Sequence, residues 1–385
     1  MRTVFWTIFF TIFYCYLGYP AALSLLARLR PRSIRKSRIF PAVSVILSIY
    51  NEEDTIEAKL NNLLFLDYPQ DKFEIIVGSD GSTDRTNAII KNFRDSRIQF
   101  HENARRYGKM ATLNRLVTAA KGEILVFTDA RQIFAKNAIN ELVNNFADPL
   151  VGCVSGELIF SKETSVTGRG INLYWEYEKF IRKNESRIHS MLGATGAIYA
   201  IRRELFEKGP DNTILDDMFI PLKIIQKGYR AVFDEKAEAY DKVAESPREE
   251  HRRKARTLFG NYQIFCMVPA MFNPMKSPIA LQLFSHKFLR VVMPFLLMAV
   301  FVLNFLLRDN FLFRVFFILQ IIFYTMAMIG ALLRYQSRGI LKTISTMCYI
   351  PYVFCLLNFS ALVGFFRFLG SRQEIAWGKA RIKQC

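Results

Sequence analysis

The chain has 385 residues and a formal net charge of +18, and 51% of its residues are hydrophobic. This length allows one to three domains. The positive charge suits nucleic-acid binding, but much of the basic excess flanks apolar segments, where Lys and Arg anchor helices against anionic lipid headgroups. We therefore expect membrane lipids, and no nucleic acid, as partners. The cysteines are scattered without a CxxC pair, which argues against a disulfide framework or a zinc site.

The first predicted element is a membrane anchor in residues 1–38. Residues 4–27 carry no charge and are long enough, as a helix, to cross a hydrocarbon core of ~30 Å. A cleaved signal peptide is the alternative, but the apolar run exceeds the usual ~7–15 residues and lacks a small-x-small cleavage site. Residues 28–38 hold six basic residues and no acid, so the positive-inside rule places them, and the domain that follows, in the cytosol.

Residues 39–262 alternate between strand-like and helix-like patterns. This alternation predicts an α/β domain with a mostly parallel sheet and helices on both faces. Ligands of such sheets bind at the carboxyl ends of the strands, where Tyr50, Asp80 and Asp129 fall. The strands are expected at residues 41–50, 73–78, 97–101 and 123–128. The helices are expected at residues 52–66, 85–93, 109–120 and 135–146.

Two of these three strand-end residues, Asp80 and Tyr50, have a functional and a purely structural interpretation. Asp80 can accept a hydrogen bond from the N3–H of uracil, or it caps the following helix. Tyr50 stacks a base, or it closes the hydrophobic core. Asp129 can hold a divalent cation that bridges to a diphosphate, because hard cations take oxygen ligands.

A second set of polar residues lies farther along the chain. Asp217 precedes an apolar run, and a carboxylate in such surroundings tends to have the raised pKa of a general base. The alternative is that Asp216 or Asp217 caps a helix at 218–226. The cations at 252–256 either anchor the chain at the membrane or clamp a departing diphosphate. Gly193 and Gly196 permit a turn without side chains, useful where a substrate approaches closely.

The C-terminal part is predicted to be membrane-embedded. Residues 263–286 contain three prolines and are expected to lie in the membrane interface, whereas residues 287–366 hold three uncharged stretches of spanning length. Four spans in all would put both ends outside, which conflicts with a basic tail at 367–385. Either one late segment does not span, or residues 264–284 are also embedded; the sequence leaves both alternatives open.

Taken together, these motifs resemble those of membrane-embedded glycosyltransferases of family 2, the inverting group that includes cellulose and hyaluronan synthases. The resemblance covers residues 41–263. It implies a GT-A fold, Rossmann-like, inserted between an N-terminal transmembrane helix and a C-terminal block of such helices in a multi-pass cell-membrane protein. It also implies three groups of site residues. The donor is held by Tyr50, Glu52, Asp80, Lys109 and Asp129; the catalytic base is Asp217, assisted by Arg253 and Arg256; the acceptor-side loop contains Gly193, Thr195 and Gly196.

Two departures from the family pattern concern the metal and the product. Asp129 matches the first acid of the metal-binding Asp-x-Asp motif, but Arg131 stands at the second position and cannot ligate Mg²⁺ or Mn²⁺. We therefore assign Arg131 to donor binding and leave metal dependence open. The Gln-x-x-Arg-Trp signature of processive synthases appears as residues 253–257 without its Gln and Trp, which favours the addition of one or a few sugars.

The predicted function is inverting transfer of a sugar from a UDP-sugar to a lipid-linked or polysaccharide acceptor at the cytosolic membrane face, for cell-surface polysaccharide synthesis. A processive synthase is the alternative within this enzyme class. An inactive membrane-anchored protein that binds a nucleotide or an anionic lipid is the alternative outside it. A Rossmann dehydrogenase is disfavoured because no Gly-x-Gly-x-x-Gly follows the first strand.

Overall fold

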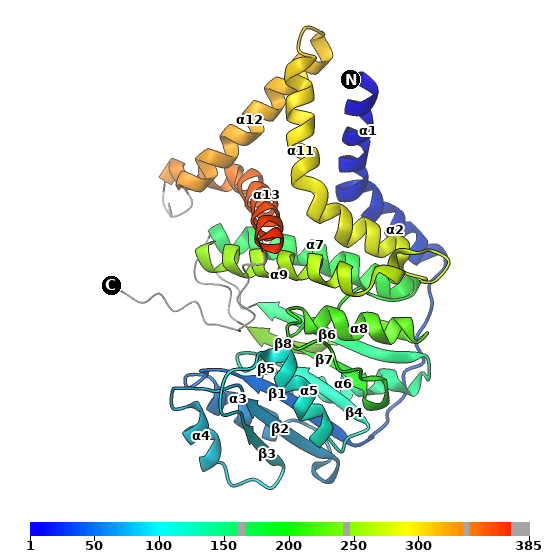
Figure 1. The fold of residues 1–385 in the computed structure, drawn as a ribbon, viewed down its shortest axis with the longest axis vertical. Helices are drawn as coiled ribbons and strands as arrows, with labels where there is room; N and C mark the ends of the chain where they lie inside the picture. The colour runs from blue at the N-terminus through cyan, green and yellow to red at the C-terminus, as the bar shows by residue number, and fades with distance from the viewer. Residues whose placement is uncertain (161–165, 242–246, 334–338, 371–385) are drawn as a thin grey trace.

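The computed structural model describes residues 1–160, 166–241, 247–333 and 339–370, so the predicted tail lies outside the described residues from position 371 onward. Figure 1 shows a sheet-containing domain at one end and long apolar helices at the other. Two helices, α7 (Val166–Ile188) and α9 (Pro247–Met267), lie between these two parts.

The domain is built on one eight-stranded sheet with the order β3-β2-β1-β4-β7-β6-β8-β5. β1 pairs in parallel with β2 and β4, and β2 pairs in parallel with β3. β7 runs antiparallel to β4 and β6, and β5 runs antiparallel to β8. The predicted mostly parallel, Rossmann-like sheet is confirmed. The strands are β1 (Val43–Ile49), β2 (Phe73–Ser79), β3 (Ile98–Glu102), β4 (Ile124–Thr128), β5 (Ile133–Phe134), β6 (Val151–Phe160), β7 (Tyr199–Arg202) and β8 (Arg230–Asp241).

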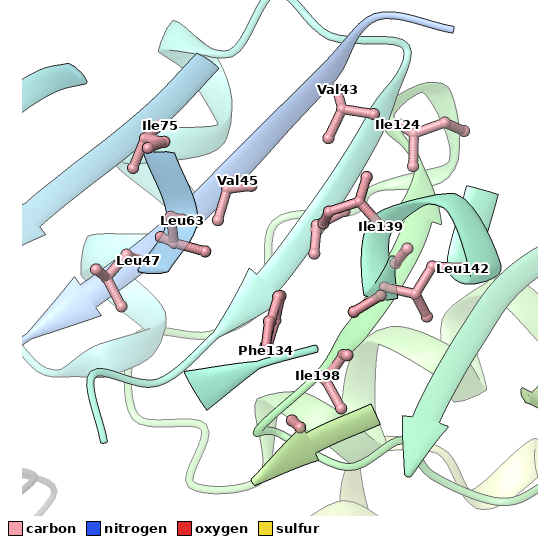
Figure 2. Close-up of a cluster of buried hydrophobic side chains, with 14 of the residues drawn as sticks. Val43, Val45, Leu47, Leu63, Ile75, Ile124, Phe134, Ile139, Leu142 and Ile198 are labelled. Carbon is pink, nitrogen blue, oxygen red and sulfur yellow. The ribbon is translucent and has the colours of Figure 1, made fainter. Parts of the chain in front are cut away.

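Alternation along β1 explains why both faces of the sheet are covered. Successive side chains of a strand point to opposite faces, so Val43, Val45 and Leu47 pack on one side and Ile46 on the other. The first side meets α3 (Ile56–Leu64) and α6 (Ala138–Asn144), in the cluster that Figure 2 shows. The second side meets α5 (Lys109–Ala119) and α8 (Asp216–Gln226). The remaining short helices of the domain are η2 (Gln70–Lys72), α4 (Thr86–Asn92), η3 (Asn145–Ala147) and η4 (Arg203–Leu205).

Two helices begin later than the sequence pattern predicts. α3 starts at Ile56 rather than at position 52, because the preceding residues form a turn in which Thr55 Oγ1 donates to Glu52 Oε2 at 2.7 Å. α6 starts at Ala138 rather than at position 135, because the short strand β5 precedes it and pairs with β8. The apolar periodicity predicted both helices correctly. It could not reveal the turn before α3 or the short strand before α6.

Within the described residues, four helices are long and apolar enough to cross a membrane: Arg2–Leu29, Ala280–Leu306, Phe311–Leu333 and Thr343–Leu369. They indicate a membrane protein. The helix Ala280–Leu306 begins inside the segment that was expected to be interfacial. Before it, helical structure is interrupted near η5 (Pro269–Phe272) and the prolines that follow. The component elements are α1 (Arg2–Phe13), η1 (Tyr14–Gly18), α2 (Tyr19–Leu29), α10 (Ala280–Gln282), η6 (Leu283–Phe288), α11 (Leu289–Leu306), α12 (Phe311–Leu333) and α13 (Gly339–Leu369).

α7 and α9 connect the sheet domain to the apolar helices. Tyr19 of α2 donates a hydrogen bond of 2.8 Å from its hydroxyl to Glu185 Oε1 of α7. Tyr262 of α9 stacks on Phe368 of α13, with 5.6 Å between ring centroids. The carboxyl ends of the central strands therefore open toward a junction that is walled by membrane helices.

Candidate active site

A single cavity of about 1910 Å³ joins the strand ends to the membrane helices. Among the residues singled out from the sequence, only Asp80 does not line it, and Asp80 is 2% exposed. The members of the set that line the cavity are Tyr50, Glu52, Lys109, Asp129, Arg131, Gly193, Thr195, Gly196, Asp217, Arg253 and Arg256. The fold therefore brings these residues together around one cavity.

Lys109 links two carboxylates at the centre of this cavity. Its Nζ lies 3.0 Å from Asp129 Oδ1 and 3.2 Å from Asp216 Oδ2. Burial by itself would lower the pKa of Lys109, but the Asp129, Asp216 and Asp217 carboxylates together raise it above its ordinary value. Lys109 is therefore a fixed positive charge beside three acids.

Asp217 has the surroundings of a general base. Burial first, and then the neighbouring Asp216 carboxylate, raise the pKa of Asp217 to about 6. Its Oδ2 accepts a hydrogen bond of 3.2 Å from the backbone N–H of Gly196, and its own carbonyl accepts one of 2.7 Å from Ala194 N. A carboxylate with this pKa is ionised at neutral pH and is a stronger base than an ordinary aspartate.

The glycine loop lies directly against Asp217. A Cβ added at Gly196 would lie 3.2 Å from Asp217 Oδ2, whereas one added at Gly193 would meet its neighbours at an ordinary 3.5 Å. Thr195 anchors the loop, because its backbone N–H donates to Ser155 Oγ at 2.9 Å and its hydroxyl accepts from Arg182. The loop thus sets the position of the carboxylate.

Asp80 holds a turn and does not cap the helix that follows it. Its two oxygens accept hydrogen bonds from Tyr107 N at 2.8 Å and Gly108 N at 2.9 Å. The first turn of α4 is capped instead by Asp84, whose Oδ1 accepts from Thr86 N at 3.0 Å. Asp80 therefore orients the turn from which Lys109 enters the cavity.

Tyr50 is covered on one face by an arginine that sequence reasoning missed. Arg106 Cζ lies 4.1 Å from the centroid of the Tyr50 ring, and Arg106 Nε and Nη2 are buried without a hydrogen-bond partner in the described structure. A stacked guanidinium with unused donors suits a planar or anionic ligand. The only signal in the sequence was a basic pair just before Gly108.

Arg131 and Arg256 differ in orientation. Arg131 Nη2 lies 3.9 Å from Asp241 Oδ2, and the Arg131 side chain is 47% exposed. Arg256 is half-buried; desolvation lowers its pKa, and it interacts electrostatically with Asp216, Asp129 and Asp217. Arg256 is thus the arginine that faces the acids.

The residues present do not by themselves form a resident metal site. No group of three or more His, Cys, Asp or Glu side chains suited to a metal occurs in the described parts of the chain. Asp129 Oδ1 is already paired with Lys109 Nζ, and Arg131 cannot ligate a cation. A divalent ion would need most of its oxygen ligands from a bound diphosphate.

Lys59 and two aromatic residues were also missed. Lys59 is fully buried below Asp129, where its Nζ donates to Thr128 Oγ1 at 2.9 Å and to Gln132 O at 2.6 Å, and burial lowers its pKa to about 7. On α7, Tyr174 and Trp175 line the cavity with Lys254 Nζ at 4.2 Å and 5.2 Å from their ring centroids. A lysine on the apolar face of a predicted helix was the available signal for Lys59; the aromatic pair carried none.

The comparisons with known proteins agree with this geometry. Residues 44–209 match the model of glycosyl transferase family 2. The poly-beta-1,6-N-acetyl-D-glucosamine synthase of Staphylococcus aureus (strain MSSA476) is 27% identical over 248 residues, which cover 61% of this chain and 58% of the relative. The probable glycosyltransferase YdaM of Bacillus subtilis (strain 168) is 26% identical over 258 residues, covering 64% of this chain and 61% of the relative. The chain spans less than two thirds of the length of either relative.

A solved structure shows the same fold over nearly the whole chain. The mannosyltransferase PcManGT from Pyrobaculum calidifontis, determined in complex with GDP-Man and Mn²⁺, superposes with a TM-score of 0.73 at 23% identity, covering 96% of this chain and 99% of that one. The fold is therefore GT-A. The match of residues 44–209 to the model of glycosyl transferase family 2 agrees with the family that the motifs predicted.

Proposed function

We propose that the protein is a membrane glycosyltransferase that moves a sugar from a UDP-sugar to a lipid-linked or polysaccharide acceptor at the cytosolic membrane face, in cell-surface polysaccharide synthesis. One observation carries the proposal. The partly buried base Asp217 opens into the same cavity as the Lys109–Asp129–Asp216 charge network and the strand-end residues.

The proposed reaction is a single displacement with inversion. An acceptor hydroxyl attacks the anomeric carbon while Asp217 takes the proton of that hydroxyl. The bond between the anomeric carbon and the diphosphate breaks, and UDP leaves with the electron pair. We assign Lys109 and Arg256 to stabilise the charge that develops on the leaving group; Arg253 lines the same cavity and is assigned with them. An α-linked donor would give a β-linked product.

Donor binding is assigned to the opposite end of the cavity. Tyr50 and Glu52 line the cavity just after β1, and the guanidinium of Arg106, which does not line it, lies over the Tyr50 ring and supports that ring as a planar face for a base. We assign Asp80 to the same function, acting on the uracil or through the 107–108 turn that it holds. Arg131 is assigned to the diphosphate. Mg²⁺ or Mn²⁺ would be held mainly by the diphosphate with Asp129, because the described side chains do not by themselves form a site for either ion.

A donor screen tests the proposal. Detergent-purified protein is incubated with a panel of UDP-sugars and with GDP-mannose, with Mg²⁺, with Mn²⁺ and with a chelator, and nucleotide release is measured. We expect release from at least one UDP-sugar. Binding of nucleotide without release under any of these conditions would favour the inactive binding protein instead.

A further inference from the structure

The cavity continues past Asp217 into a section with a different chemical character. Here η1 and α13 contribute Tyr16, Tyr349, Asn358 and Arg367 to the wall, together with a larger group of apolar side chains. The apolar side chains are Leu17, Ile350, Val353, Phe354, Leu357 and Ala361. Apolar walls of this kind are suited to a hydrocarbon chain rather than to the hydroxyl groups of a sugar.

Two cations lie where the apolar section meets the catalytic section. Lys287 lines the cavity, and in the described structure its Nζ makes no hydrogen bond or ion pair. Arg290 also lines it and pairs through Nη1 with Glu178. Its guanidinium lies 5.1 Å from the centroid of the Tyr177 ring, and in the described structure its Nε and Nη2 are buried without a hydrogen-bond partner. Buried donors that lack partners are costly in a folded protein, so their presence beside a cavity indicates a missing acceptor group.

The nearby acids are already occupied. Glu178 accepts from His286 Nε2 at 3.2 Å as well as from Arg290, and Glu185 accepts from His286 Nδ1 and from the Tyr19 hydroxyl, each at 2.8 Å. Arg182 and the Asp217 carboxylate also act electrostatically on Lys287, so what remains unsatisfied at this end of the cavity is the set of donors on Arg290 and Lys287 rather than a net charge. An anion is the ligand that suits it.

Simple anchoring of a helix to lipid headgroups does not account for these cations. An anchoring side chain extends outward to the headgroups. Lys287 and Arg290 instead face the cavity, and the two free nitrogens of Arg290 are shielded from solvent.

We propose that this section binds the acceptor as a lipid phosphate. The phosphate lies between Lys287 and Arg290, the hydrocarbon chain runs along α13 and η1, and the sugar carried by the phosphate reaches Asp217. The inference rests on the proposed function, and it narrows the acceptor to a sugar joined through phosphate to a lipid.

The test is a binding measurement that requires no turnover. Full-length protein in nanodiscs of zwitterionic lipid is titrated with farnesyl phosphate, with farnesol and with inorganic phosphate. The main variant is Lys287→Met, because Lys287 contributes no hydrogen bond or ion pair within the described residues, and its loss leaves no partner unpaired. The matched control is Lys276→Met, which removes an exposed lysine outside the cavity.

We expect farnesyl phosphate to bind more tightly than either farnesol or inorganic phosphate. Lys287→Met should weaken farnesyl phosphate binding about tenfold or more, the usual size of a lost charge-assisted contact, without changing the affinity for farnesol. Lys276→Met should leave both affinities unchanged. Equal affinity for farnesol and farnesyl phosphate, equal affinity for inorganic phosphate, or no effect of Lys287→Met would each overturn the proposal.

Failure of this proposal is distinguishable from failure of the proposed function. If the protein releases UDP from a sugar donor but does not discriminate farnesyl phosphate from farnesol, then the lipid-phosphate site is wrong and glycosyl transfer stands. If farnesyl phosphate binds as expected but no donor is turned over, then the protein binds a lipid phosphate without the proposed chemistry.

Discussion

The pKa of Asp217 connects the geometry of one residue to a measurable pH dependence. Burial and the Asp216 carboxylate raise this pKa to about 6, and only the ionised carboxylate can accept a proton. The turnover rate should therefore rise as the pH increases through about 6 and level off above it. A pH–rate profile at saturating donor tests this, and a rate that does not change across that interval would rule out Asp217 as the titrating base.

A substitution of Asp80 tests its proposed role in nucleotide binding separately from the chemical step. In Asp80→Ala the N–H groups of Tyr107 and Gly108 lose their acceptor, and the turn before Lys109 loosens. We expect weaker UDP binding, a smaller effect on turnover at saturating donor, and a loss of about 1–3 kcal/mol in the free energy of unfolding. Asp80→Asn, which keeps one acceptor oxygen, is the control. If calorimetry shows unchanged UDP affinity in Asp80→Ala, then Asp80 only supports the turn.

At the scale of elements, the glycine loop controls the position of Asp217, the proposed base on α8. In Gly196→Ala the new Cβ would lie 3.2 Å from Asp217 Oδ2, closer than ordinary contact, so the carboxylate must shift. We expect turnover to fall by about tenfold or more, since small displacements of a catalytic group are costly, while donor affinity is kept. Gly193→Ala is the matched control, because its Cβ would fit at 3.5 Å. Equal activities of the two variants would contradict this role of the loop.

The helices and strands that supply the cavity residues explain which of these residues could be predicted from the sequence. The strand-end residues were predictable because each parallel strand delivers its next residue to the same edge of the sheet, as Tyr50 and Asp129 do. Arg182 and Trp175 were not, because α7 approaches the cavity from a segment without a motif, and helical periodicity does not reveal which distant element a helix faces. The close pairing of Lys109 with both Asp129 and Asp216 likewise depends on the packing of α5 against the sheet.

At the scale of the whole molecule, the cavity bears on product length. The chain lacks the Trp of the processive signature at Thr257, but α7 supplies Tyr174 and Trp175 to the same cavity. We keep the prediction of one or a few sugars per encounter, since the section beyond Asp217 is walled by apolar side chains. Chromatography of the product under limiting acceptor measures this. Long chains accompanied by unused acceptor would contradict it and would point to the aromatic pair as a polymer platform.

Nucleotide release by wild-type protein and by Asp217→Asn, measured beside UDP affinity, tests the central claim most directly. Removing a positioned base typically lowers the rate by ~10²–10⁴-fold, whereas the strand-end residues that are assigned to the donor are untouched. We therefore expect release from a UDP-sugar to fall by that factor in Asp217→Asn, with UDP affinity nearly unchanged. Asp217→Asn turning over at the wild-type rate would contradict the assignment and make Asp216 the next candidate.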